Sequence, residues 1–136
     1  MPITISPAPH HARTLLFVFE GRWTWEEFHA AYDQLIEQSR AFERQPWHII
    51  SVLFNLTLPP GDAINHGQKE FRRAVEHGAR SLICATDSPL FTMLGRLGVS
   101  FYGEFRGIFH VVNGLEAGYA IVEKAEAPAA EPTPSS

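Results

Sequence analysis

The chain has 136 residues, a net charge of −4 and an apolar fraction of 45%. This length accommodates one domain with one core, and the composition excludes intrinsic disorder of the whole chain. An isoelectric point near 5.9 argues against nucleic acid as the partner, since proteins that bind it carry a basic surface that displaces counterions.

The first residues, MPITISPAPHHAR, contain no charged segment followed by an apolar stretch, and no apolar run approaches the roughly 20 residues that span a bilayer. We therefore expect a cytoplasmic protein without a membrane span. The single cysteine, Cys84, lies in the apolar run LICA and is interpreted as a core residue.

The first half of the chain predicts two strands and a helix. A short edge strand at Ile3 to Ile5 precedes a stronger strand at Thr14 to Glu20. Thr24 and Glu27 have the spacing of a capping box, so a helix begins there and ends before Pro46. Its buried stripe is predicted from apolar residues at helical spacing: Trp25, Phe28, Tyr32, Leu35, Ile36 and Phe42.

The middle of the chain predicts two buried strands around a second helix. The run WHIISVLFNL, residues 47–56, is apolar on both faces, as in a strand covered by helices. The second helix runs from an N-cap at Asp62 to His77, with Gly78 as its C-terminal cap. Arg80 to Thr86 is the next strand.

The last third predicts two more helices around one strand. Ser88 and Pro89 have the cap-and-proline pattern that opens a helix. Arg106 to Val112 is the last strand, and Asn113 caps a last helix that buries Leu115, Ile121 and Val122. Residues 126–136 are rich in Ala, Pro, Glu and Ser, a composition typical of a disordered tail.

From Thr14 onward, strands and helices therefore alternate four times. This order predicts an α/β fold over residues 1–125, with a mixed, mainly parallel sheet of four to five strands and about four amphipathic helices. We expect the edge strand to pair antiparallel with the strand at Thr14.

No motif indicates an enzyme, a metal or a cofactor. Neither glycine-rich phosphate loop follows a strand, and the strand ends carry too few acids for a magnesium site. The seven histidines lack metal-ligand spacing, and no serine stands in a nucleophile elbow. We therefore expect a binding protein without catalytic activity, metal or cofactor.

One polar segment, residues 57–73 (TLPPGDAINHGQKEFRR), follows a central strand and opens the second helix. Asp62, Asn65, His66 and Lys69 share one helical face. Two interpretations stay open: a solvated face opposite the apolar one, or a recognition surface at the carboxyl end of a parallel strand.

From about Ile3 to Lys124 the chain resembles a STAS-like domain, the fold of anti-sigma-factor antagonists and of the cytoplasmic ends of sulfate transporters. The resemblance lies in the short first strand and in the segments TLLFVFEGRWT, WHIISVLFNLT and RSLICATDSPLFTMLG. It implies a bacterial signalling module that binds proteins or nucleotides, and some relatives of that fold hold lipids.

Regulatory members of that family carry a phosphorylatable Ser or Thr after an Asp where the helix begins. Here Asp62 is followed by Ala63, and the nearest hydroxyl is Thr57. A phosphate on Thr57 would add about −1.5 to −2 charge beside a helix N-terminus.

Three hypotheses follow. The first is a STAS-like module whose protein-contact surface comprises Thr57, Asp62, Asn65, His66, Lys69, Arg72 and Arg73. The second is a pocket for a small apolar ligand or lipid among Phe91, Met93, Phe101, Tyr102 and Phe105. The third is a homodimer formed through Phe101, Tyr102 and Phe105.

Overall fold

A computed structural model describes residues 2–53, 63–89, 92–93 and 103–127. Its strands form one five-stranded sheet in the order β1-β2-β3-β4-β5. The first pair is antiparallel and the other three pairs are parallel. The strands are β1 (Ile3–Pro7), β2 (Thr14–Phe19), β3 (Trp47–Leu53), β4 (Ala79–Thr86) and β5 (Phe109–Asn113). The predicted α/β class and mixed sheet are confirmed.

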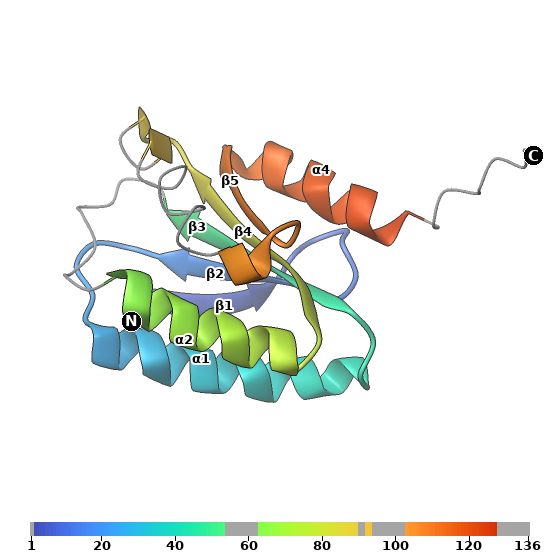
Figure 1. Cartoon of the computed structure of the whole chain (residues 1–136), viewed down its shortest axis with the longest axis horizontal. Coiled ribbons are helices and arrows are strands. Elements are labelled where there is room, and N and C mark those ends of the chain that lie inside the picture. The colour runs from blue at the N-terminus through green and yellow to red at the C-terminus, as the bar shows by residue number, and fades with distance from the viewer. Residues whose placement is uncertain (1, 54–62, 90–91, 94–102, 128–136) are drawn as a thin grey trace, which may run out of the picture.

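Helices lie on both faces of this sheet (Figure 1). On one face, α1 (Trp25–Ser39) and α2 (Ala63–Glu76) run side by side, and α4 (Leu115–Glu126) covers the other. Two short 3-10 helices, η1 (Arg40–Phe42) and η2 (Gly103–Phe105), complete the elements. The described residues contain three α-helices, one fewer than predicted. The helix expected from Ser88 falls largely outside them, although the Thr92 amide donates to the Ser88 carbonyl at 3.0 Å.

Side chains that alternate along the strands pack into two separate hydrophobic cores, one on each face of the sheet. Phe17, Ile49 and Leu82 pack beneath α1 and α2. Ile50 and Ile83 point to the opposite face, where they meet Val122 of α4. The period of two along each strand explains why the central strands are apolar throughout.

The predicted start of α1 is confirmed. The Thr24 hydroxyl accepts from the Glu27 amide at 3.1 Å, and the Glu27 carboxylate accepts from the Thr24 amide at 2.9 Å. Trp23 stacks on Phe28 and closes the apolar staple across this turn. The helix ends at Ser39, before the predicted end, because the chain tightens into η1.

Two predictions near the C-terminus are wrong. The last strand begins at Phe109, not Arg106, because η2 and a turn with Gly107 at φ 85° occupy the preceding residues. Asn113 does not cap α4 but ends β5, paired with Thr86. The N-cap is Gly114, at φ 97°, a backbone conformation that glycine adopts without strain.

Candidate functional site

The second helix, α2, carries five of the seven predicted contact residues. Asn65, Lys69 and Arg72 are exposed, whereas His66 and Arg73 are partly buried. Thr57 and Asp62 lie outside the described residues. The structure therefore divides the predicted set between the outer surface of α2 and its contact with α1.

A buried carboxylate, Glu70, organises the α1–α2 contact. Its side chain is only 2% exposed. One of its oxygens accepts from His29 Nδ1, and the other lies 3.0 Å from Arg73 Nε. Arg73 also reaches Asp33 of α1 at 2.8 Å. Both ends of this network lie on α1, so it fixes how the two helices sit against each other.

His66 extends the same network toward the N-terminus of α2. His29 donates through Nδ1 to a carboxylate, so its neutral form accepts through Nε2, and His66 Nδ1 donates to it at 2.9 Å. The His66 ring also stacks on the Trp25 indole, with centroids 4.5 Å apart. His66 was predicted to be an exposed residue of the contact surface, but its side chain packs against His29 and Trp25.

The other flank of α2 is tied to η2. Glu104 accepts from Gln68 Nε2 at 2.6 Å and from Arg72 at 2.9 Å. These hydrogen bonds, with Arg72 as the larger cause, hold the pKa of Glu104 below its usual value. The same contact raises the pKa of Arg72.

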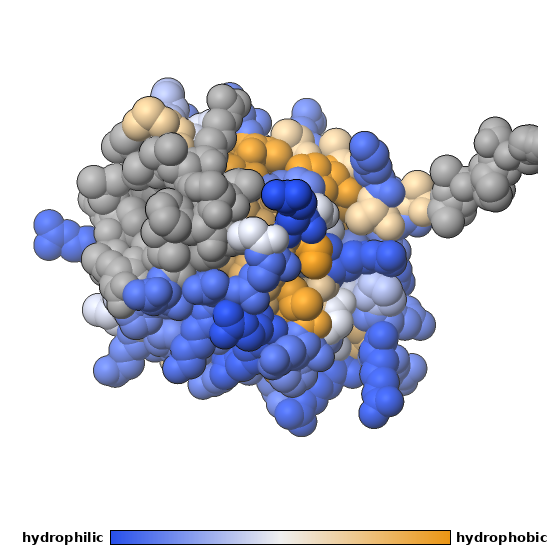
Figure 2. All heavy atoms as spheres, viewed as in Figure 1, coloured by the Kyte–Doolittle hydropathy of each residue, from blue (hydrophilic) through white to orange (hydrophobic). Residues whose placement is uncertain are grey.

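The exposed side of α2 carries a row that we call the α2 ridge, and its member Arg72 also makes the contact with η2: Asn65, Lys69, Arg72 and Glu76. The members are three or four positions apart and so lie along one side of the helix. Lys69 has no hydrogen-bond or ion-pair partner among the described residues. The ridge carries polar groups, and mostly hydrophilic side chains cover the side of the molecule that α1 and α2 occupy in Figure 2.

Sequence reasoning did not identify Glu70 or its partners on α1. One signal was present, because Glu70 lies three and four positions from buried residues of α2, Gly67 and Ala74. A carboxylate on the inner side of an amphipathic helix is buried, and a buried charge is stable only with a partner of opposite charge. The identity of that partner depends on packing between segments about forty residues apart.

A serine, a histidine and a glutamate also meet beneath α4. Ser81 Oγ lies 2.8 Å from His48 Nδ1, and His48 Nε2 lies 2.7 Å from Glu126. Because a carboxylate only accepts, Nε2 donates and Nδ1 accepts from the serine. The serine is 2% exposed and the histidine 0%, so a substrate cannot reach the hydroxyl. This chain of hydrogen bonds joins α4 to the sheet.

Neighbouring charges strengthen that attachment. Arg13 pairs with Glu126 and donates through Nε to the Pro46 carbonyl at 2.8 Å. Partial burial opposes ionisation of Glu126, but the hydrogen bond from His48 and the charge of Arg13 together lower its pKa. Burial is the main cause that lowers the pKa of His48.

Cys84 lies in β4 on the face covered by α1 and α2, as the interpretation as a core residue requires. Its side chain retains some exposed surface. Burial nevertheless raises the pKa of the thiol to about 12, so it stays protonated at neutral pH. A protonated thiol is a poor nucleophile and a poor metal ligand.

Described residues line two open pockets of different size, among others. The smaller one, about 370 Å³, lies at the carboxyl ends of β4 and β5 and is lined by Asp87, Pro89, Thr92, Met93 and Asn113. The larger one, about 690 Å³, lies between the ends of α1 and α2.

The apolar-ligand hypothesis depended on aromatic residues near the third predicted helix. Phe91, Phe101 and Tyr102 lie outside the described residues. Phe105 packs in the core against Phe71, and Met93 is 53% exposed. These two described members are therefore not brought together in one pocket, since only Met93 lines the smaller one.

Within the described parts of the chain, no three His, Cys, Asp or Glu side chains are grouped to hold a metal ion. Over the same residues, no helix is long and apolar enough to cross a membrane. No protein-family model matches the chain, and no curated protein matches it.

Proposed function

We propose that this chain is a STAS-like regulatory module that binds a protein partner through the α2 ridge. The observation that carries the proposal is the contrast across α2. Its flanks are committed to α1 and η2 through Glu70, Arg73 and Glu104, whereas Lys69, which has no partner among the described residues, faces solvent.

This contrast favours binding for a physical reason. Ordering a mobile side chain or a loop on association costs free energy, and a surface on a fixed helix avoids part of that cost. The Glu70 network fixes α2 against α1 before any partner arrives. The central Lys69 then contributes an uncommitted positive charge to the contact.

The sheet order supports the family proposal. One antiparallel pair at the edge is followed by parallel strands, and the helix after the central strand carries the ridge. This is the order that the resemblance to STAS-like domains implies. Phosphorylation at Thr57 remains a prediction.

The test is charge reversal on the ridge. The double variant Lys69→Glu and Arg72→Glu should recover at least about tenfold less of the partner from the native host than the parent does. This loss is expected when charges are reversed at a contact. Its melting temperature should fall only slightly, because Lys69 has no described partner and the Arg72–Glu104 pair, which the reversal turns into a like-charge contact, is exposed.

The matched control reverses two exposed basic residues outside α2, Arg22→Glu and Lys124→Glu. It changes net charge by the same amount and should retain capture. Equal capture by the ridge variant and the parent would refute the proposal, and so would equal losses in both double variants.

A further inference from the structure

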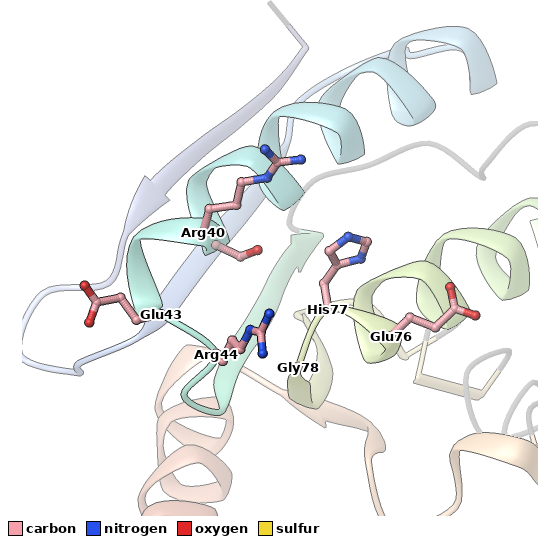
Figure 3. A pocket seen from close by; sticks show the side chains of 7 residues that line it. Arg40, Glu43, Arg44, Glu76, His77 and Gly78 are labelled. Carbon is pink, nitrogen blue, oxygen red and sulfur yellow. The ribbon is translucent and has the colours of Figure 1, made fainter.

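A second site lies where α1 and α2 end, beyond Glu76, the last member of the α2 ridge. An open pocket of about 690 Å³ separates the C-terminal end of α2 from η1 and the turn that follows it (Figure 3). Its lining comprises Ser39, Arg40, Glu43, Arg44, Glu76, His77 and Gly78.

The pocket lining holds two arginines and two glutamates. In Figure 3 the Arg44 guanidinium and the His77 ring lie on the side of the gap, whereas Glu43 and Glu76 point outward in opposite directions. Arg40 pairs only loosely with Glu37, at 3.4 Å, and both are largely exposed. The cationic group on the side of the gap is therefore the Arg44 guanidinium.

Arg44 is the arginine of this lining whose position no contact within the chain accounts for. Among the described residues it has no hydrogen-bond or ion-pair partner. A cation near a helix C-terminus is often explained by the partial negative charge of the last carbonyls. Here His77 performs that role, since its Nδ1 donates to the Arg73 carbonyl at 2.9 Å. The Arg44 guanidinium makes no comparable contact.

The backbone beneath Arg44 is also unusual. Glu43 and Arg44 are consecutive non-glycine residues with positive φ, 51° and 69°. The first ends η1 as its C-cap. Both are the central residues of a turn that the Gln45 amide closes on the Phe42 carbonyl at 2.9 Å, and positive φ at both positions is typical of a type I′ turn. This turn fixes the backbone from which the Arg44 side chain extends.

We propose that this pocket binds the phosphate group of a small phosphorylated molecule. A guanidinium presents a planar fork that matches two phosphate oxygens; Arg44 supplies such a fork on the side of the gap, and Arg40 is a second cation in the lining. The pocket volume falls within the range of about 300–1,000 Å³ typical of small-molecule sites. It exceeds the size of a phosphate ion, so there is room for a body beyond the phosphate.

An NMR titration tests this proposal. Inorganic phosphate and glucose 6-phosphate are added separately to the ¹⁵N-labelled full chain, with glucose as the uncharged comparison. Both phosphates should shift the amide signals of residues 39–44 and 76–78 in a saturable manner, glucose 6-phosphate at lower concentration. Glucose alone should leave them in place.

The variant Arg44→Gln should weaken binding of both phosphates by about tenfold, the loss of one charge-assisted contact. Its amide spectrum without ligand should match the parent outside the turn, because Arg44 has no described partner. The control Arg22→Gln, exposed on the β2–α1 connection, should bind like the parent.

Two results would overturn the proposal. One is the absence of a saturable shift at residues 39–44 and 76–78. The other is a shift of equal size in the parent and in Arg44→Gln, which would indicate general attraction of anions to the surface. Saturable binding by inorganic phosphate with none by glucose 6-phosphate would overturn the inference that the ligand carries a larger body.

Discussion

Glu70 shows how one side chain can orient a pair of helices. It is buried, yet it belongs to a charge network that reaches His29 and Arg73. A buried carboxylate without partners is strongly unfavourable, so each of these contacts constrains the position of α2. The orientation of the α2 ridge depends on this constraint.

Replacing Glu70 with Gln should therefore destabilise the protein by about 2 kcal/mol, since it removes the buried negative charge that faces Arg73 and His29 and leaves a single amide oxygen as acceptor. Urea unfolding followed by circular dichroism measures the change. The control Glu76→Gln, exposed on the same helix, should stay within about 0.5 kcal/mol of the parent. Equal stability of both variants would show that the network does not hold the helices.

The burial of His48 predicts that the free energy of unfolding decreases as the pH falls. Burial lowers its folded pKa below the unfolded value near 6.5, so the unfolded chain binds this proton more readily. The stability it contributes is present above about pH 6.5 and is lost as the pH falls toward the folded pKa. His11, whose pKa is raised chiefly by its hydrogen bond to Glu123, acts in the opposite direction.

Comparison with His48→Gln isolates this contribution, because His11 is common to both proteins. The parent should lose more unfolding free energy than the variant between pH 7.5 and about pH 5.5. The measurement is urea unfolding at each pH, with the exposed His10→Gln as a control that keeps the parent's slope. A steeper slope in His48→Gln would contradict the assignment of a neutral buried imidazole.

At the scale of the element, α4 lies unusually close to the sheet at one residue. A methyl group added to Gly118 would meet Ile83 and Ile50 at 3.4 and 3.5 Å. That is ordinary contact for a methyl and too close for a longer side chain. The helix interior otherwise favours alanine over glycine by up to about 1 kcal/mol.

Gly118→Ala should therefore leave stability unchanged or raise it by up to about 1 kcal/mol, whereas Gly118→Leu should lower it by about 1–3 kcal/mol through overpacking. Thermal unfolding of the two variants measures both effects. A loss in Gly118→Ala as large as that in Gly118→Leu would mean that α4 packs more tightly than the structure shows.

Local rules predicted most elements and some of their ends. The Thr24–Glu27 capping box and the Gly78 cap depend on neighbouring residues, and both occur as expected; Gly78 has φ 98°. Asn113 failed as a cap because pairing of β5 with β4 extends through it. A cap residue is available to a helix only if the sheet does not use it first.

At the scale of the whole molecule, the hydrophobic pattern predicted the sheet, because buried parallel strands are apolar on both faces. It could not predict which polar residues meet. His29 and Glu70 are paired by the crossing of two helices, and His48 and Glu126 by the closing of α4 over the sheet. Spacing along the sequence carries no information about either contact.

The same limit applies to the candidate site. The polar segment that opens the second helix was identified, but its members were expected to act together. Packing divides them, since His66 and Arg73 turn to α1 and Lys69 faces solvent. The phosphate pocket combines the ends of two helices, and no motif in the sequence indicates it.

Hydrogen–deuterium exchange on the chain, free and bound to its captured partner, tests the central proposal most directly. The account predicts slower exchange on binding in peptides covering residues 65–76, with α4 unchanged. Protection confined to α4 or to the β5 edge, with no change over residues 65–76, would contradict the α2 ridge as the contact surface.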